Sequence, residues 1–258
     1  MAKCVRMENR SEGARADGRA FDELRPVSFQ TGVAANAGGS ALATFGNTRV
    51  ICAACIERRV PAWLMGANPP KGWITAEYSM MPYSTPSRKP RPSALKPDGR
   101  AMEIQRLIGR SIRAVADLEK LAGFTLFLDC DVIQADGGTR TASICGAYVA
   151  AKIAVAGLLK HGELESDPFV DSVAAVSVGL LGGRALLDLP YSEDVDADVD
   201  ANVVMTGSAK FVELQFSGEE AVFDGSQVAE MCALAKKGIG EILGLQRTAI
   251  DSAIAAPA

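Results

Sequence analysis

The junction of a strand pattern with a helix pattern constrains the fold of this chain more than any other feature. Residues 124–134 (FTLFLDCDVIQ) are predicted to form a strand, because apolar residues run through a short segment rich in strand-forming side chains. Residues 141–160 then follow as a long helix pattern. The connection contains Gly137 and Gly138, which let the backbone turn tightly and approach a ligand closely. This junction indicates a fold that mixes strands with helices.

Further patterns extend the mixed fold along the chain. Strands are predicted at 26–33, 40–46, 48–56 and 72–80, then at 172–189 as two strands around a Leu-Gly-Gly turn, and at 202–206 and 211–216. Helices are predicted at 101–121 and 226–248. This order predicts an α/β (α+β) fold of two similar halves, in a single domain over residues 16–248. Residues 1–15 and 249–258 are expected to be flexible tails.

Residues 82–99 interrupt both kinds of periodicity. Prolines alternate there with basic side chains, and proline at that density sustains neither a helix nor a central strand. The residues are Pro82, Pro86, Pro90, Pro92 and Pro97 with Arg88, Lys89, Arg91 and Lys96. We predict an extended basic loop, for which a solvated linker is the simplest interpretation.

Charge is unevenly distributed between the two halves. Residues 1–113 hold 18 Lys and Arg against 9 Asp and Glu, whereas residues 114–258 hold 9 against 22. The net charge of −4 argues weakly against a nucleic-acid partner, but the asymmetry indicates a part that faces polyanions and an acidic part that binds metal or solvent. Chance surface composition is the alternative interpretation.

Several protein classes are disfavoured by what the sequence lacks. No stretch approaches the roughly 20 apolar residues that a membrane-spanning helix needs. The polar first residues have no apolar segment of a secretory signal, so we expect a cytoplasmic protein. Cys52 and Cys55 have the spacing of redox and zinc motifs, but they fall on a predicted strand where they would face opposite sides. We predict buried structural thiols instead.

The segment Asp136-Gly-Gly-Thr-Arg-Thr-Ala-Ser143 carries the sharpest local signal for a ligand. It places hydroxyl groups and Arg140 where a helix begins, and a helix N-terminus presents free N–H groups and partial positive charge. Together these groups predict a phosphate or sulfate site, although the P-loop pattern is absent. A glycine-rich turn followed by ordinary helix capping is the alternative.

A second signal is an acidic segment in which six carboxylates fall within thirteen residues: Asp188, Glu193, Asp194, Asp196, Asp198 and Asp200. Such clusters bind hard cations such as Mg²⁺ through oxygen, but a solvated acidic loop explains the pattern equally well. The only histidine is His161, so imidazole-based nucleophilic catalysis is disfavoured. The combination suits a phosphoryl-type transfer, which depends on positioning and charge stabilisation.

At this point the sequence resembles the ribonuclease PH family over nearly its whole length, from Ala16 to about Gln246. The segments that carry the resemblance include GNTRVIC, GWITAEYSMMP, GRAMEIQRLIGRSIRAV, LDCDVIQADGGTRTASICGA and YSEDVDADVDANVVMTGS. The resemblance implies a two-layer fold with two similar halves and a homo-hexameric ring built as a trimer of dimers. It also implies the reaction, a 3′→5′ phosphorolysis of RNA, tRNA precursors above all, which releases nucleoside diphosphates with Mg²⁺ or Mn²⁺ as cofactor.

The resemblance also assigns roles to individual residues. Arg100, Gly138, Thr139 and Arg140 match the family's phosphate-binding positions, and Asp194 and Asp200 match its catalytic and metal-binding aspartates. Arg88 and Arg91 match basic positions in a loop implicated in RNA contact and ring assembly. This assignment selects two of the six carboxylates, a choice that the acidic pattern alone leaves open.

The sequence departs from the family pattern at three places. Tyr83 stands where arginine is usual, Cys145 where threonine is common, and Phe216 where glycine is common. The first departure puts the details of RNA contact and ring assembly in doubt, and a tyrosine there is able to stack on a base. A non-catalytic RNA-binding ring subunit and a small-molecule kinase are the alternatives. The complete set of implied site residues argues against the first, and the lack of a fuller nucleotide loop against the second.

Overall fold

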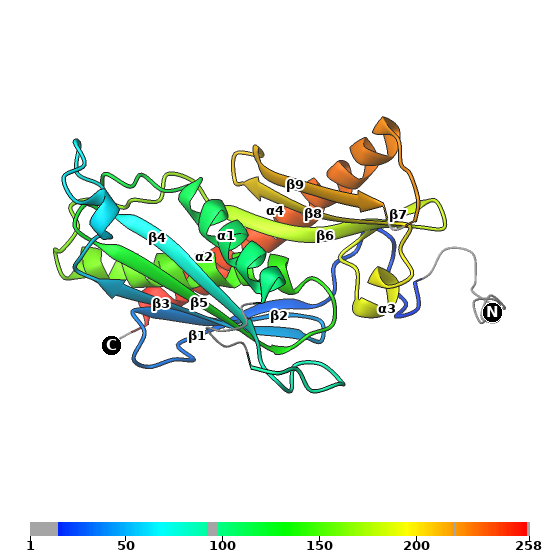
Figure 1. Ribbon diagram of the computed structural model, residues 1–258, viewed down its shortest axis with the longest axis horizontal. Coiled ribbons are helices and arrows are strands. Elements are labelled where there is room, and N and C mark those ends of the chain that lie inside the picture. The colour runs from blue at the N-terminus through cyan, green and yellow to red at the C-terminus, as the bar shows by residue number, and fades with distance from the viewer. Residues whose placement is uncertain (1–14, 92–97, 219, 257–258) are drawn as a thin grey trace.

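The protein is described by a computed structural model that covers residues 15–91, 98–218 and 220–256. Within these residues the strands form two sheets (Figure 1). The five-stranded sheet has the order β1 (Val27–Thr31), β2 (Gly39–Phe45), β3 (Thr48–Glu57), β5 (Thr125–Gln134) and β4 (Trp73–Met80). The four-stranded sheet has the order β7 (Arg184–Leu187), β6 (Val173–Leu181), β8 (Val199–Thr206) and β9 (Phe211–Gly218). The β4–β5 pair is parallel and the other pairs are antiparallel.

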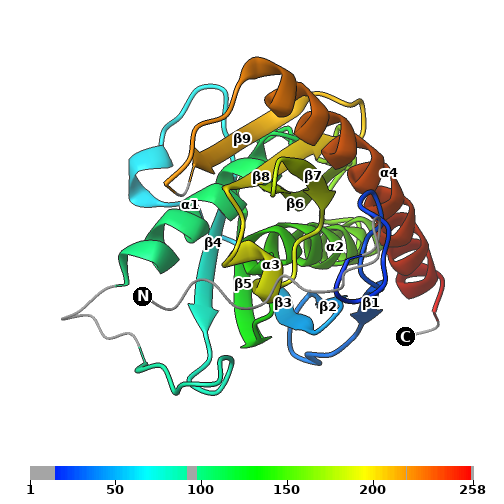
Figure 2. The ribbon, with the colours of Figure 1, turned by 90° about the vertical axis from the view of Figure 1, so that its right-hand side faces the viewer.

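Helices fill the space between the sheets and cover one face of each. The central helix α2 (Thr139–Lys160) contacts β2 and β3 of one sheet and β6 of the other (Figure 2). Helix α1 (Gly99–Arg113) packs on β4, and α4 (Gly225–Ala255) packs on β6 and β7. Two short elements, η1 (Ala62–Leu64) and α3 (Tyr191–Asp194), complete the set. The predicted mixed fold of sheets and helices is therefore confirmed.

Helix α2 is apolar on almost all sides because both sheets pack against it. Its 22 residues are long and apolar enough to cross a membrane by length and composition alone, so the expectation that no segment approaches this limit was wrong. Most of its apolar window is buried inside the protein, which is the environment of a core helix. Gly146 lets α2 approach β3 closely, since a Cβ there would lie 2.6 Å from Sγ of Cys52.

One continuous hydrophobic core joins both sheets and the long helices. The alternation along β3 buries Cys52 and exposes Cys55, as the strand pattern predicts. Cys55 is therefore not the buried thiol we expected, although the two sulfurs do face opposite sides. In the parts of the chain that the structure describes, no group of three or more His, Cys, Asp or Glu side chains forms a metal site.

Three predicted boundaries need correction. The first helix ends at Arg113 rather than near residue 121, because the backbone of Val115 and Asp117 pairs with the segment 168–170 instead of continuing the helix. The last helix continues to Ala255 and buries Ile250, so the predicted tail 249–258 is mostly helical. At the other end Arg15 is buried, although it was expected in the tail, and the preceding residues lie outside the described ranges.

Candidate active site

The connection between β5 and α2 brings two distant segments of the chain together. Gly137 and Gly138 have φ angles of +75° and +65°, a region that favours glycine. The Thr48 hydroxyl donates to the carbonyl oxygen of Gly137 at 2.6 Å and accepts from the backbone N–H of Asp136 at 2.9 Å. A Cβ on Gly137 would lie 2.4 Å from the carbonyl oxygen of Leu189, so only glycine allows the acidic segment to approach the start of α2 this closely.

The first turn of α2 carries the residues that the sequence marks for anion binding. Thr139 and Arg140 are its first two residues, and the first N–H groups of a helix have no carbonyl acceptor within it. Thr139 is buried and its Oγ1 lies 2.9 Å from the hydroxyl oxygen of Tyr78. The Arg140 guanidinium donates to Oε1 of Gln215 at 2.9 Å and lies 3.7 Å from a carboxylate oxygen of Glu103. The predicted phosphate-binding pair therefore sits on a rigid helix end with its arginine held in place.

Arg100 reaches the same region from the first turn of α1. Its backbone N–H donates to the Asp98 side chain at 3.0 Å, which caps this helix. Burial raises the pKa of Asp194 and the negative charge of Asp200 raises it further, while Arg100, Arg140 and Arg25 oppose that rise. The charges of Asp200 and of the three arginines therefore act on Asp194, although these residues come from separate parts of the chain.

The six carboxylates of the acidic segment divide according to their surroundings. Asp188 and Glu193 are buried and bind arginine side chains, so they belong to the structural framework. Asp196 and Asp198 are exposed, and Asp198 accepts a hydrogen bond from the N–H of the β6–β7 turn. Asp194, the last residue of α3, and Asp200, in β8, are the pair that remains at the site. The segment is therefore neither one loop nor one metal cluster.

The Asp194–Asp200 pair fits a hard divalent cation. Oδ1 of Asp200 is buried and has no hydrogen-bond partner among the described residues. A buried carboxylate oxygen without a partner is unfavourable, and a cation relieves both that cost and the repulsion from Asp194. Mg²⁺ commonly takes one or two protein carboxylates and completes its shell with water and phosphate oxygens, so two aspartates suffice.

A buried ion pair connects the two halves of the chain next to this pair. Arg25 donates to both carboxylate oxygens of Asp188, from Nε at 2.9 Å and from Nη2 at 2.7 Å, and also to the carbonyl oxygen of Asp136. Burial alone would raise the pKa of Asp188, but the hydrogen bonds and charge of Arg25, with Arg19, hold that pKa below its ordinary value. Arg15 forms a similar buried pair with Glu193, the neighbour of Asp194.

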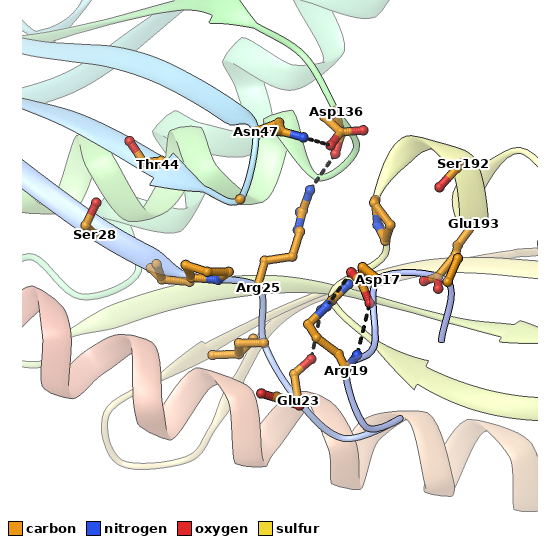
Figure 3. A pocket seen from close by; sticks show the side chains of 16 residues that line it. Asp17, Arg19, Glu23, Arg25, Ser28, Thr44, Asn47, Asp136, Ser192 and Glu193 are labelled. Carbon is orange, nitrogen blue, oxygen red and sulfur yellow. Dashed lines mark hydrogen bonds and ion pairs between the residues drawn. The ribbon is translucent and has the colours of Figure 1, made fainter. Parts of the chain in front are cut away.

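A cavity of about 840 Å³ lies beside this ion-pair network (Figure 3). The first described residues, the β1–β2 edge, Asp136 and α3 line it, and Figure 3 shows Asn47 and Arg25 both directed at Asp136. None of the six residues predicted for phosphate or metal binding lines this cavity. It therefore flanks the framework that holds the site and is distinct from the site itself.

The predicted RNA-binding arginines lie on the loop that follows β4. Arg88 and Arg91 are exposed, and the side chain of Tyr83 in the same loop is 69% exposed. Burial raises the pKa of Asp131 on β5, Asp129 adds to the rise, and the charge of Arg91 opposes it. Of the prolines and lysine that we predicted to shape this loop, Pro92, Lys96 and Pro97 lie outside the described residues.

The sequence patterns did not predict the contacts that hold the site residues in place. Tyr78 lies on the same face of β4 as the buried residues Ile74 and Ala76, so its pattern is that of an ordinary buried aromatic. Arg25 and Asp188 are 163 positions apart, and no local pattern connects them. Asp188 is one of the six carboxylates of the acidic segment, but that segment does not indicate Arg25 as its partner; both residues lie within 16–246, where the sequence resembles the ribonuclease PH family.

Comparison with known proteins identifies relatives that match most of the chain. Models of the 3′ exoribonuclease family match residues 23–156 (domain 1) and 171–238 (domain 2). The ribonuclease PH of Bacillus subtilis (strain 168) is 52% identical over 242 residues, which cover 93% of this chain and 98% of that protein. The ribonuclease PH of Corynebacterium efficiens is 51% identical over 245 residues, which cover 95% and 99%.

Two solved structures resemble the fold. An Archaeoglobus fulgidus exosome with RNA bound to the active site has a chain with a TM-score of 0.75 and 26% identity, covering 90% of this chain and 92% of that one. Rice Rrp46 has a TM-score of 0.74 and 20% identity, covering 92% and 100%, and supports the fold alone.

Proposed function

The chain belongs to the ribonuclease PH family and is a phosphate-dependent 3′→5′ exoribonuclease, and we propose that its reaction centre lies between the first turn of α2 and the Asp194–Asp200 pair. In this reaction an oxygen of inorganic phosphate attacks the last phosphodiester of the RNA. The bond to the 3′ oxygen of the preceding nucleotide breaks, and a nucleoside diphosphate is released. The proton of the hydrogen phosphate ends on the new 3′ hydroxyl.

The attacking phosphate is held by Arg100, Gly138, Thr139 and Arg140. The free N–H groups at the start of α2 and the Thr139 hydroxyl donate hydrogen bonds to it, while the two guanidinium groups compensate its charge. The chemical difficulty is the approach of one anion to another, and fixed positive charge in a partly buried site lowers that barrier. The observation that supports this proposal is the close packing of the glycine turn before α2 on the acidic segment, where a Cβ on Gly137 would lie 2.4 Å from the carbonyl oxygen of Leu189. The charges of Arg100 and Arg140, which oppose the rise in the pKa of Asp194, agree with it.

The cofactor is Mg²⁺, with Mn²⁺ as the alternative ion, and Asp194 and Asp200 would hold it. Such an ion neutralises charge on the phosphate oxygens and stabilises the oxygen that leaves. The protein itself contributes a carboxylate oxygen of Asp200 that is buried and without a partner among the described residues, and a second carboxylate whose pKa burial raises.

The RNA partner reaches this centre past the basic loop. Exposed Arg88 and Arg91 contact its phosphates, and Tyr83 offers an exposed ring on which a base stacks. From the resemblance to the ribonuclease PH family, the proposal includes tRNA precursors as the substrate, a homo-hexamer built as a trimer of dimers as the assembly, and the cytoplasm as the location.

The deciding experiment is incubation of a 3′-tailed RNA with the protein and Mg²⁺, with and without inorganic phosphate, followed by separation of the nucleotides. Nucleoside diphosphates that appear only with phosphate are the expected result. Nucleoside monophosphates without phosphate would mean hydrolysis and would overturn the proposed roles of Thr139 and Arg140. A folded protein that binds RNA but releases nothing would make it a non-catalytic ring subunit.

A further inference from the structure

Tyr78 contacts Thr139, the residue whose hydroxyl is proposed to bind phosphate. It comes from β4, its side chain is only 3% exposed, and its hydroxyl oxygen is 2.9 Å from Oγ1 of Thr139. Within the ranges that the structure describes, this is the sole hydrogen bond of either hydroxyl group. The phenol therefore contacts the hydroxyl group that, in the proposed function, donates to phosphate.

The direction of this hydrogen bond decides what Thr139 can offer. Each hydroxyl has one proton to donate. When Thr139 donates to Tyr78, its oxygen presents only lone pairs to the site, and these repel an anion. When Tyr78 donates to Thr139, the Thr139 proton is free to point at an anion, and the two hydrogen bonds strengthen one another.

We propose that Tyr78 is a positioning residue for phosphate: its phenol donates to Thr139 and thereby commits the Thr139 hydroxyl to donate to the attacking anion. The inference rests on the proposed phosphate-binding role of Thr139 and adds a residue behind it. The phenol is held in β4, so the geometry is fixed before phosphate arrives.

The surroundings keep Tyr78 in the donating form. Burial raises the pKa of Tyr78, and the hydrogen bond to Thr139 and the charges of Arg100 and Arg140 only partly oppose that rise. The phenol is therefore neutral at the pH of the reaction. A neutral phenol has a proton to donate, whereas a phenolate would turn Thr139 away from the anion.

The test is a double-mutant cycle of Tyr78→Phe and Thr139→Val, which remove one hydroxyl each and keep the shape. We expect Tyr78→Phe to raise the KM for phosphate about three- to tenfold, the usual range for one hydrogen bond, with RNA affinity measured without phosphate unchanged. In the Thr139→Val background, Tyr78→Phe should add nothing to the KM for phosphate, because its effect passes through the missing hydroxyl. In Thr139→Ser, which keeps the hydroxyl, the effect of Tyr78→Phe should return.

Matched controls separate this role from packing. Tyr148 is another buried tyrosine, packed edge to face against Phe169 in the core, and Tyr148→Phe should leave the KM for phosphate as it is. Melting curves of all variants identify any loss of fold. An unchanged KM in Tyr78→Phe, or an equal rise with and without the Thr139 hydroxyl, would overturn the inference. If Thr139→Val and Arg140→Ala both leave that KM unchanged, the proposed phosphate site itself is wrong.

Discussion

The two sides of the proposed active site are built in opposite ways. On the anion side, at the start of α2, Thr139 and Arg140 already have partners in Tyr78 and Gln215. On the carboxylate side, at α3 and β8, Asp200 keeps a buried oxygen without a partner among the described residues, and its charge raises the pKa of Asp194. The anion side is therefore organised before its ligand arrives. On the carboxylate side, the repulsion between Asp194 and Asp200 is unfavourable until a bound cation compensates their charges.

The strongest way to break this arrangement is to cut the ion pair that connects the two sides. Asp188→Asn leaves the buried Arg25 without its counter-charge. We expect a loss of about 3–5 kcal/mol in the free energy of unfolding, measured by denaturant titration, because removal of one partner of a buried pair is strongly destabilising. An unchanged midpoint would show that Arg25 is stabilised by its other acceptors, such as the carbonyl oxygen of Asp136.

The same pair gives the wild-type protein a characteristic dependence on pH. The pKa of Asp188 is lower in the folded protein than its ordinary value of 3.8. The stability from this carboxylate is therefore complete above the unfolded pKa and is lost as pH falls through the folded pKa. Stability curves of wild type and Asp188→Asn should differ most above pH 4 and converge in stronger acid. A constant difference across that range would contradict the assignment.

Asp200→Asn tests the carboxylate side directly. It removes a charge from the proposed cation site and relieves Asp194, so we expect kcat to fall about 100-fold or more, with RNA binding and melting temperature retained. Mg²⁺ should raise the melting temperature of wild type but not of this variant. Asp196→Asn, an exposed acid of the same segment, is the matched control. Equal turnover in both variants would remove Asp200 from the mechanism.

Arg140→Ala tests the anion side. Loss of one charge-assisted hydrogen bond should raise the KM for phosphate about tenfold, while the carboxylate side keeps its Mg²⁺ response. The control is Arg106→Ala, an exposed arginine of α1. Should the phosphate KM stay constant while the Mg²⁺ response disappears, Arg140 would belong to the carboxylate side instead.

The smallest effect is expected outside the site, on the basic loop. Replacement of both Arg88 and Arg91 by alanine should weaken RNA binding only a few-fold, about twofold for each exposed charge, and should reduce its dependence on salt. The KM for phosphate should not change, because neither residue is part of the anion side. RNA affinity that responds to salt as in wild type would exclude this loop from RNA contact.

Sequence patterns predict those parts of this molecule that depend on neighbours along the chain. The strand at 124–134 and the buried helix after it follow from local composition, and so does the anion-binding role that we predict for the first turn of that helix. Local composition does not show which of the six carboxylates are at the site. Asp188 and Glu193 are occupied by arginines more than 160 positions away, and only this long-range pairing leaves Asp194 and Asp200 as the candidates. The role of Tyr78 is not predicted for a related reason. Alternation along a strand indicates which residues are buried, but it does not indicate that the Tyr78 hydroxyl contacts the hydroxyl of Thr139.

The pairing of Arg15 with Glu193, 178 positions later, also sets an order of events during synthesis. Arg15 and Arg25, which hold α3 and the glycine turn in place, are synthesised long before their partners Glu193 and Asp188, which follow 178 and 163 positions later. Contacts between such distant positions form only after the entropy of closing a very long loop has been overcome. A growing chain that stops before residue 193 therefore lacks the contacts that hold α3 and the glycine turn beside the proposed catalytic centre.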